Sequence, residues 1–82
     1  MNKEILQKVQ EIISEQMGYP TENVTPNSEL DYNLNVGSLD RIEIFIKIED
    51  TFSIQISDEQ TEGIEKVSDL VELIEKKISD KD

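Results

Sequence analysis

The chain has 82 residues, 19 acidic and 8 basic side chains and a formal net charge of −11. This length allows one domain with one small core, and we expect residues 1–82 to form it. The charge argues against nucleic acid and anionic membranes as partners and favours basic patches on other proteins. The absence of histidine and cysteine excludes an imidazole-activated nucleophile, a disulfide and a metal site built on thiolates or imidazoles.

Residues 3–17 have the pattern of an amphipathic helix, because apolar side chains recur at helical spacing and charged ones lie mostly elsewhere. Gly18 and Pro20 follow at positions where helices commonly stop. The apolar stripe consists of Ile5, Leu6, Val9, Ile12, Ile13 and Met17.

Residues 18–37 are rich in turn-forming residues and predict a long loop. Val24, Leu30 and Leu34 recur within it, and we expect them to attach the loop to the core. A connection of this length is unusual in a small domain and indicates either a function or a required crossing between helices.

Residues 38–56 permit two interpretations. Isoleucine alternates with other residues at 42, 44, 46 and 48, and the alternation resumes beyond Thr51, which slightly favours a two-stranded hairpin. As a helix, the same segment would spread its apolar side chains over roughly 220° at about 100° per residue. Such a helix must pack on two sides, line a cavity or meet a partner.

The C-terminal part predicts two helices. Ser57 and Gln60 form a capping-box pattern that would open a short helix ending at Gly63. Val67 to Ile78 then repeat apolar residues at helical spacing, with Ser68 as the expected cap.

The middle of the chain resembles a known family. The segments Ser38-Leu39-Asp40 and Ile42-Glu43, followed by 48–52 and 56–59, are similar in type and register to acyl carrier proteins of dissociated (type II) fatty-acid and polyketide synthesis. The resemblance extends from about Ile5 to Lys77. It implies an all-α fold, an acyl-carrier-like four-helix bundle with a short third helix and a long first loop. In that fold residues 38–52 would be a helix.

The resemblance also implies a function. Ser38 would carry phosphopantetheine, donated from coenzyme A by a phosphopantetheinyl transferase, and the arm would hold acyl groups as thioesters without catalysis by the chain itself. We expect a cytoplasmic monomer that meets acyl-transfer and synthase enzymes through their basic docking patches. The residues expected at that contact are Asp40, Arg41, Glu43, Glu49 and Asp50. The residues expected around an acyl pocket are Ile48, Ile56, Thr61, Ile64 and Leu70.

Three features depart from the family pattern. Gly37 stands where the family usually has aspartate, which could slow modification. Arg41 and Lys47 place positive charges in the recognition helix. Thr61 and Leu70 occupy pocket positions that are commonly alanine, so we expect a short or polar acyl cargo.

Other interpretations remain open at this point. Ser38 could be an ordinary helix cap, and the acids could be a solvated face. The chain could be an unmodified acyl-carrier-like acidic adaptor, or a peptidyl carrier of nonribosomal synthesis.

No stretch has the EF-hand spacing, and we expect no metal site. The N-terminal residues do not resemble a signal peptide, and no apolar run approaches the roughly 20 residues of a membrane span.

Overall fold

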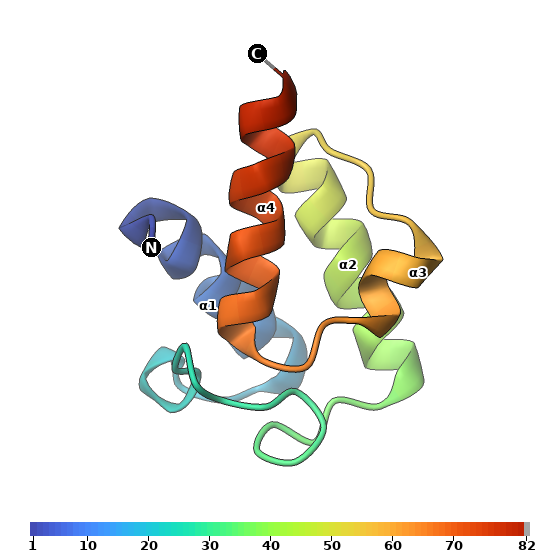
Figure 1. Ribbon diagram of the computed structural model, residues 1–82. Coiled ribbons are helices and arrows are strands. Elements are labelled where there is room, and N and C mark those ends of the chain that lie inside the picture. Colours follow the sequence, from blue (N-terminus) through green and yellow to red (C-terminus); the bar gives the residue numbers. More distant parts are fainter. Residues whose placement is uncertain (82) are drawn as a thin grey trace.

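The computed structural model describes residues 1–81. Its elements are α1 (Lys3–Met17), the 3₁₀ turn η1 (Thr21–Asn23), α2 (Ser38–Phe52), α3 (Asp58–Glu62) and α4 (Val67–Lys81). Helix α1 packs against both α2 and α4, the short α3 lies beside α2, and the loop 18–37 runs across one end of the bundle (Figure 1). The expected all-α bundle is confirmed. Within residues 1–81, no helix is both long and apolar enough to cross a membrane.

Helix α2 decides between the two interpretations of residues 38–56. The hairpin that the alternation favoured is wrong, and residues 38–52 form one helix. Ile44, Phe45 and Ile48 are buried in the core, whereas Ile42 and Ile46 are each 57% exposed. In a strand, Ile42, Ile44, Ile46 and Ile48 would share one face. The burial follows helical spacing instead.

The long first loop is part of the core. Its side chains Val24, Leu30 and Leu34 are buried as expected, and so is Val36. Its backbone pairs with the α3–α4 connection: the Leu30 N–H donates to the Glu65 carbonyl (2.9 Å), and the Val67 N–H donates to the Ser28 carbonyl (3.0 Å). The loop is therefore held by packing and hydrogen bonds, and it delivers the chain to the start of α2 in a defined position.

The ends of α1 and α3 were predicted correctly. Gly18 ends α1 in the left-handed region with φ 78°, and its N–H donates to the Ser14 carbonyl. Such a cap favours glycine because other residues have a Cβ that strains this conformation. Ser57 and Gln60 make the reciprocal capping box at the start of α3.

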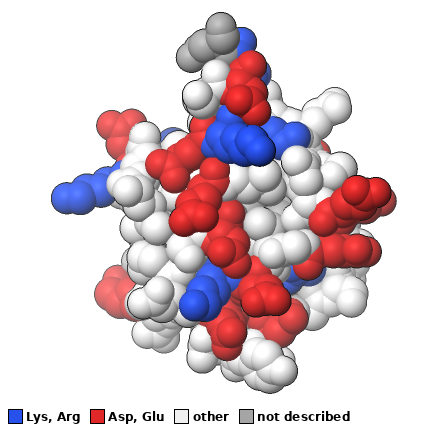
Figure 2. Space-filling view, viewed as in Figure 1, with Lys and Arg blue, Asp and Glu red and all other residues white. Residues whose placement is uncertain are grey.

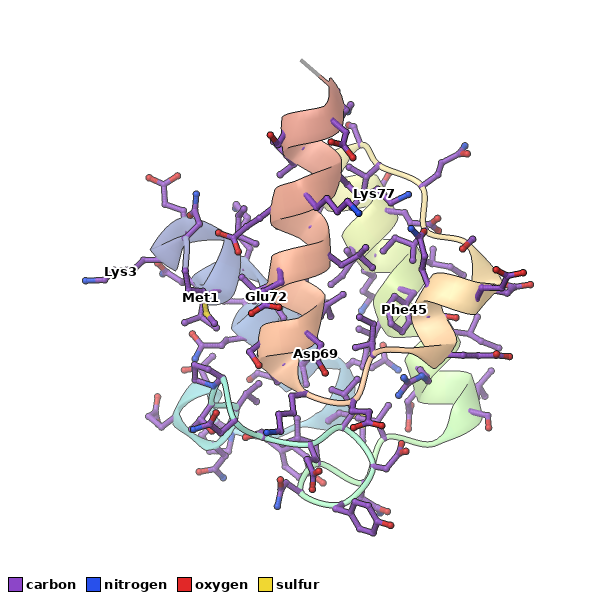
Figure 3. All side chains as sticks on the ribbon, in the orientation of Figure 1. Met1, Lys3, Phe45, Asp69, Glu72 and Lys77 are labelled. Atoms are coloured by element: carbon purple, nitrogen blue, oxygen red, sulfur yellow. The ribbon has the colours of Figure 1, made fainter. Side chains whose placement is uncertain are left out.

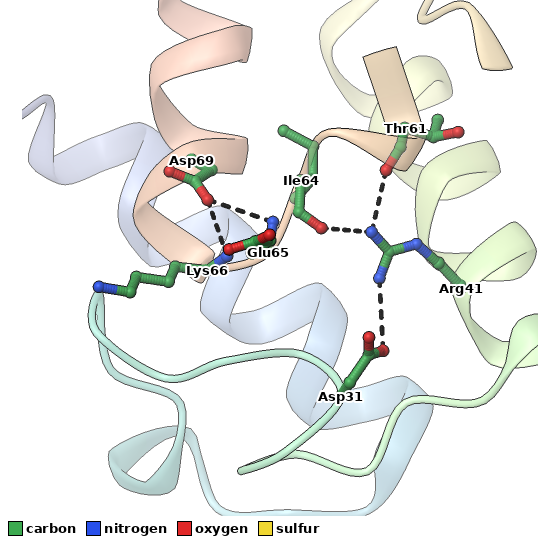
Figure 4. Close-up of polar contacts among 7 residues, drawn as sticks. All are labelled: Asp31, Arg41, Thr61, Ile64, Glu65, Lys66 and Asp69. Carbon is green, nitrogen blue, oxygen red and sulfur yellow. Dashed lines mark hydrogen bonds and ion pairs between the residues drawn. The ribbon is translucent and has the colours of Figure 1, made fainter. Parts of the chain in front are cut away.

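The start of α4 differs from the prediction. The Asp69 carboxylate accepts hydrogen bonds from the backbone N–H groups of Glu65 (3.1 Å) and Lys66 (2.9 Å) (Figure 4). The expected Ser68 cap is wrong, because the helix already begins at Val67 and the Ser68 N–H donates to the Pro26 carbonyl.

Candidate functional site

Ser38 is the first residue of α2 and its side chain is exposed. Gly37 occupies the N-cap position with no side-chain cap, and the Ser38 hydroxyl makes no hydrogen bond to residues 1–81. The interpretation of Ser38 as the helix cap is therefore wrong. The first N–H groups of a helix lack partners within the helix and favour negative charge. A phosphate on the Ser38 hydroxyl would lie beside these groups.

The surroundings of Ser38 leave room for an attached group. A cavity of about 310 Å³ lies next to it, between the first loop, the start of α2 and the end of α3. We call it the Ser38 cavity; it is lined by Asp31, Val36, Gly37, Ser38, Arg41 and Glu62. A Cβ added to Gly37 would meet no atom within 4 Å, and the Gly37 φ is −80°. The backbone therefore does not require glycine before the serine.

The acids expected at a partner contact have different roles in the structure. The Gln16 side chain of α1 donates to both Asp40 (3.1 Å) and Glu43 (2.6 Å), which brings these two carboxylates together. Glu49 accepts the Ile56 backbone N–H (2.9 Å). Asp50 is exposed. Glu49 is thus used within the fold, Glu43 is exposed although it accepts the bond from Gln16, and Asp50 is exposed.

Acidic side chains also gather beyond α2. In Figure 2 they cover the N-terminal half of α4 and the surface of α3, while basic side chains lie over the C-terminal half of α4. Within residues 1–81, no group of three or more acids is arranged to hold a metal ion.

An apolar stripe on α2 was not among the predicted site residues. Leu39 is 70% exposed, and Ile42 and Ile46 are each 57% exposed; these three residues form the exposed α2 stripe. At about 100° per residue, they share an arc of about 100° with Glu43 and Asp50. The wide apolar arc in the sequence was the signal for this surface, because one core-facing side could not account for all of it.

The five residues expected around an acyl pocket lie partly at a groove and partly in the core. A groove of about 200 Å³ lies between α2 and α3, and we call it the α2–α3 groove. Ile56 and Thr61 line this groove, whereas Ile48, Ile64 and Leu70 are buried in the core. The residues lining the groove are Arg41, Ile42, Phe45, Ile46, Glu49, Ile56, Asp58 and Thr61.

Two lining residues change the expected character of this groove. Phe45, which the sequence did not single out for the pocket, lies between α2 and α3 (Figure 3). The Thr61 hydroxyl donates to the Asp58 carbonyl (2.7 Å), so its proton is already used within α3. The lining therefore combines apolar side chains with the charged residues Arg41, Glu49 and Asp58.

Arg41 points into the fold, although we expected it at the partner contact. Its Nη2 donates to the carbonyl of Thr61 (2.9 Å) and to that of Ile64, and its Nη1 lies 3.7 Å from the Asp31 carboxylate (Figure 4). The guanidinium carbon also lies 5.7 Å from the centre of the Phe45 ring. Arg41 therefore joins α2 to the end of α3 and to the first loop.

Comparisons with known proteins agree with this geometry. A family model described as the phosphopantetheine attachment site matches residues 7–74. An acyl carrier protein of Cyanidium caldarium is 44% identical over 79 residues, which is 96% of this chain and 92% of the relative. An acyl carrier protein of Thermosynechococcus vestitus is 34% identical over 76 residues, which is 93% of this chain and 94% of the relative.

Solved structures give the same result. The crystal structure of an acyl carrier protein from Thermotoga maritima has a TM-score of 0.84 and 35% identity, covering 98% of this chain and 93% of that chain. An acyl carrier protein from Enterococcus faecalis has a TM-score of 0.78 and 36% identity, covering 92% of this chain and 95% of that chain. The chain therefore belongs to the phosphopantetheine-dependent acyl carrier protein family.

Proposed function

We propose that Ser38 is the residue that carries phosphopantetheine and that the chain transports acyl groups as thioesters. When bound, the arm supplies a terminal thiol for the thioester and the reach to enter several active sites. The observation that carries the proposal is the exposed Ser38 hydroxyl at the first position of α2, with no hydrogen-bond partner in residues 1–81. The chain acts as a carrier and not as an enzyme, in the manner of its family.

The proposed docking surface for partner enzymes is the exposed α2 stripe together with Glu43 and Asp50. These residues lie on the helix that begins at Ser38, so an enzyme bound to them would have the arm close to its active site. The apolar side chains supply most of the affinity, because burial at the centre of an interface dominates binding energy. The acids attract basic patches and raise the association rate. The partners are a phosphopantetheinyl transferase and acyl-transfer or synthase enzymes, met by a cytoplasmic monomer.

The proposed cargo is a short acyl chain. The α2–α3 groove has a volume of about 200 Å³, which is below the roughly 300–1,000 Å³ of typical small-molecule sites. Leu70 is fully buried in the core and does not line the groove. A polar cargo is less favoured, because the Thr61 hydroxyl already donates within α3. Efficient shelter of a long saturated chain by the wild-type protein would contradict this proposal.

The attachment site can be tested by intact mass. The protein is incubated with coenzyme A and a broad-specificity phosphopantetheinyl transferase, beside Ser38→Ala and the control Ser79→Ala, whose serine is exposed on α4. We expect the mass of one phosphopantetheine to be gained by the wild type and by Ser79→Ala only. Circular dichroism checks that Ser38→Ala is folded. No gain by the wild type with several transferases would favour the unmodified acidic adaptor.

A further inference from the structure

We infer that Arg41 is a latch that holds α3 against α2 and closes the α2–α3 groove at the end nearest Ser38. The inference rests on the proposed function of Ser38 and adds a residue that determines how far an attached acyl chain is sheltered. Arg41 is a positioning residue in this role, since it acts by fixing α3.

Helix α3 has few other attachments. It is five residues long, and none of its side chains is buried. Two charged side chains of α2 hold the segment at its two ends. Glu49 accepts the Ile56 N–H before α3, and Arg41 donates to the carbonyls of Thr61 and Ile64 at its end. These α2 residues are eight positions apart, about 12 Å along the helix at 1.5 Å per residue.

Arg41 lies on the direct route from the attachment site to the groove. It follows Ser38 by one helical turn, and it lines both the Ser38 cavity and the α2–α3 groove. An acyl chain held at the end of an arm on Ser38 would therefore displace the guanidinium if it entered the groove from this end. The displacement would leave the Thr61 and Ile64 carbonyls without their charged donor.

The contacts of Arg41 differ in how much they contribute to closing the α2–α3 groove. The Arg41 side chain is 21% exposed, so its bonds to the two carbonyls are largely shielded from water. Charge-assisted bonds of this kind are stronger than neutral ones. Asp31 is 75% exposed and 3.7 Å from Arg41, and such a surface ion pair contributes little. The latch therefore consists of the guanidinium and the two carbonyls at the end of α3.

The first test compares Arg41→Met with Lys47→Met. Both variants remove one positive charge from α2, but Lys47 is exposed and does not line the groove. Each modified protein is loaded with an acetyl or an octanoyl group, and the cleavage of the thioester by hydroxylamine is timed. In the wild type and in Lys47→Met, the two thioesters should react at similar rates. In Arg41→Met, the octanoyl thioester should react about tenfold more slowly than the acetyl one. A tenfold change corresponds to the free energy of burying roughly two methylene groups of the octanoyl chain in the groove.

The second test needs no attached group. In the unmodified protein, hydrogen exchange is measured at the Thr61 and Ile64 amides, which donate to Ser57 and Thr61 carbonyls. Exchange there should be faster in Arg41→Met than in Lys47→Met, with α4 amides unchanged. Should Arg41→Met fail to fold, Arg41→Lys replaces it, since lysine keeps the charge but lacks the planar fork; it should give a smaller change in the same direction.

The outcomes separate the latch from the proposed function. Equal α3 exchange in Arg41→Met and Lys47→Met would overturn the latch. So would slow cleavage of the octanoyl thioester in the wild type, because the groove would then be open with Arg41 in place. Failure of the wild type to gain phosphopantetheine would count against Ser38 as the attachment site only, and the exchange measurement would still decide on Arg41.

Discussion

Replacing Ile44 and Ile42 of α2 by alanine, one at a time, should have very different effects on stability. Ile44 is 1% exposed and Ile42 is 57% exposed, although only two positions separate them. Ile44→Ala removes three carbon groups worth about 0.8 kcal/mol each, and the cavity left behind raises the cost to about 3–4 kcal/mol. Ile42→Ala loses less than half of that transfer energy, about 1 kcal/mol. The better helix propensity of alanine offsets about 0.4 kcal/mol of this loss.

The assay is urea unfolding followed by far-ultraviolet circular dichroism. With a slope of about 1 kcal/mol per molar urea for a small domain, Ile44→Ala should lower the midpoint by about 3 M, or abolish the folded baseline. Ile42→Ala should lower it by about 0.5 M. Moderate salt should be present, because it screens the self-repulsion of a chain with a net charge of −11.

Two further variants complete the comparison. Ile48→Ala should behave like Ile44→Ala, since Ile48 is also fully buried, and Ile46→Ala should behave like Ile42→Ala. Similar costs for all four variants would refute the reasoning, because that is the result for four side chains on one face of a strand. The rate of modification supplies a second readout. Ile42→Ala should be modified more slowly while remaining folded, since Ile42 belongs to the proposed docking surface.

Three other predictions concern the loop and its ends. Gly37→Asp should speed the modification of Ser38 in transferase assays followed by mass. Its free energy of unfolding should change by no more than about 0.5 kcal/mol, because glycine and aspartate differ little as N-caps. An unchanged modification rate would show that the transferase does not need an acid at this position. Leu30→Ala, at a loop side chain that is 1% exposed, should cost about 2–5 kcal/mol in urea unfolding. Tyr32→Ala, at a side chain that is 87% exposed, should cost no more than about 0.5 kcal/mol. Equal losses of stability in Leu30→Ala and Tyr32→Ala would show that the loop is not part of the core. Gly18→Ala should cost about 1 kcal/mol because the Gly18 φ is 78°. Its melting temperature should fall by about 4–8 °C, and an unchanged value would contradict the left-handed end of α1.

The sequence alone determined the features that depend on neighbouring residues. The stop of α1 at Gly18 and the capping box of Ser57 and Gln60 are local hydrogen-bonding and backbone effects, so spacing was enough to predict them. The attachment of the first loop through Val24 and Leu30 followed from apolar residues recurring in a polar segment. The family resemblance supplied the helical form of residues 38–52 and the proposed role of Ser38.

Only the tertiary structure decided the rest. Alternating β-branched residues in α2 favour a strand locally, but packing of Ile44 and Ile48 in the bundle outweighs that preference. The N–H of Ser68 is taken by the first loop, which no local pattern could reveal. Arg41 and Glu49 were expected to face partners, yet both bind backbone groups of the segment around α3. Long charged side chains have many rotamers of similar energy, so their direction is set by partners distant in the sequence. For Arg41 those partners are carbonyls 20 and 23 residues away.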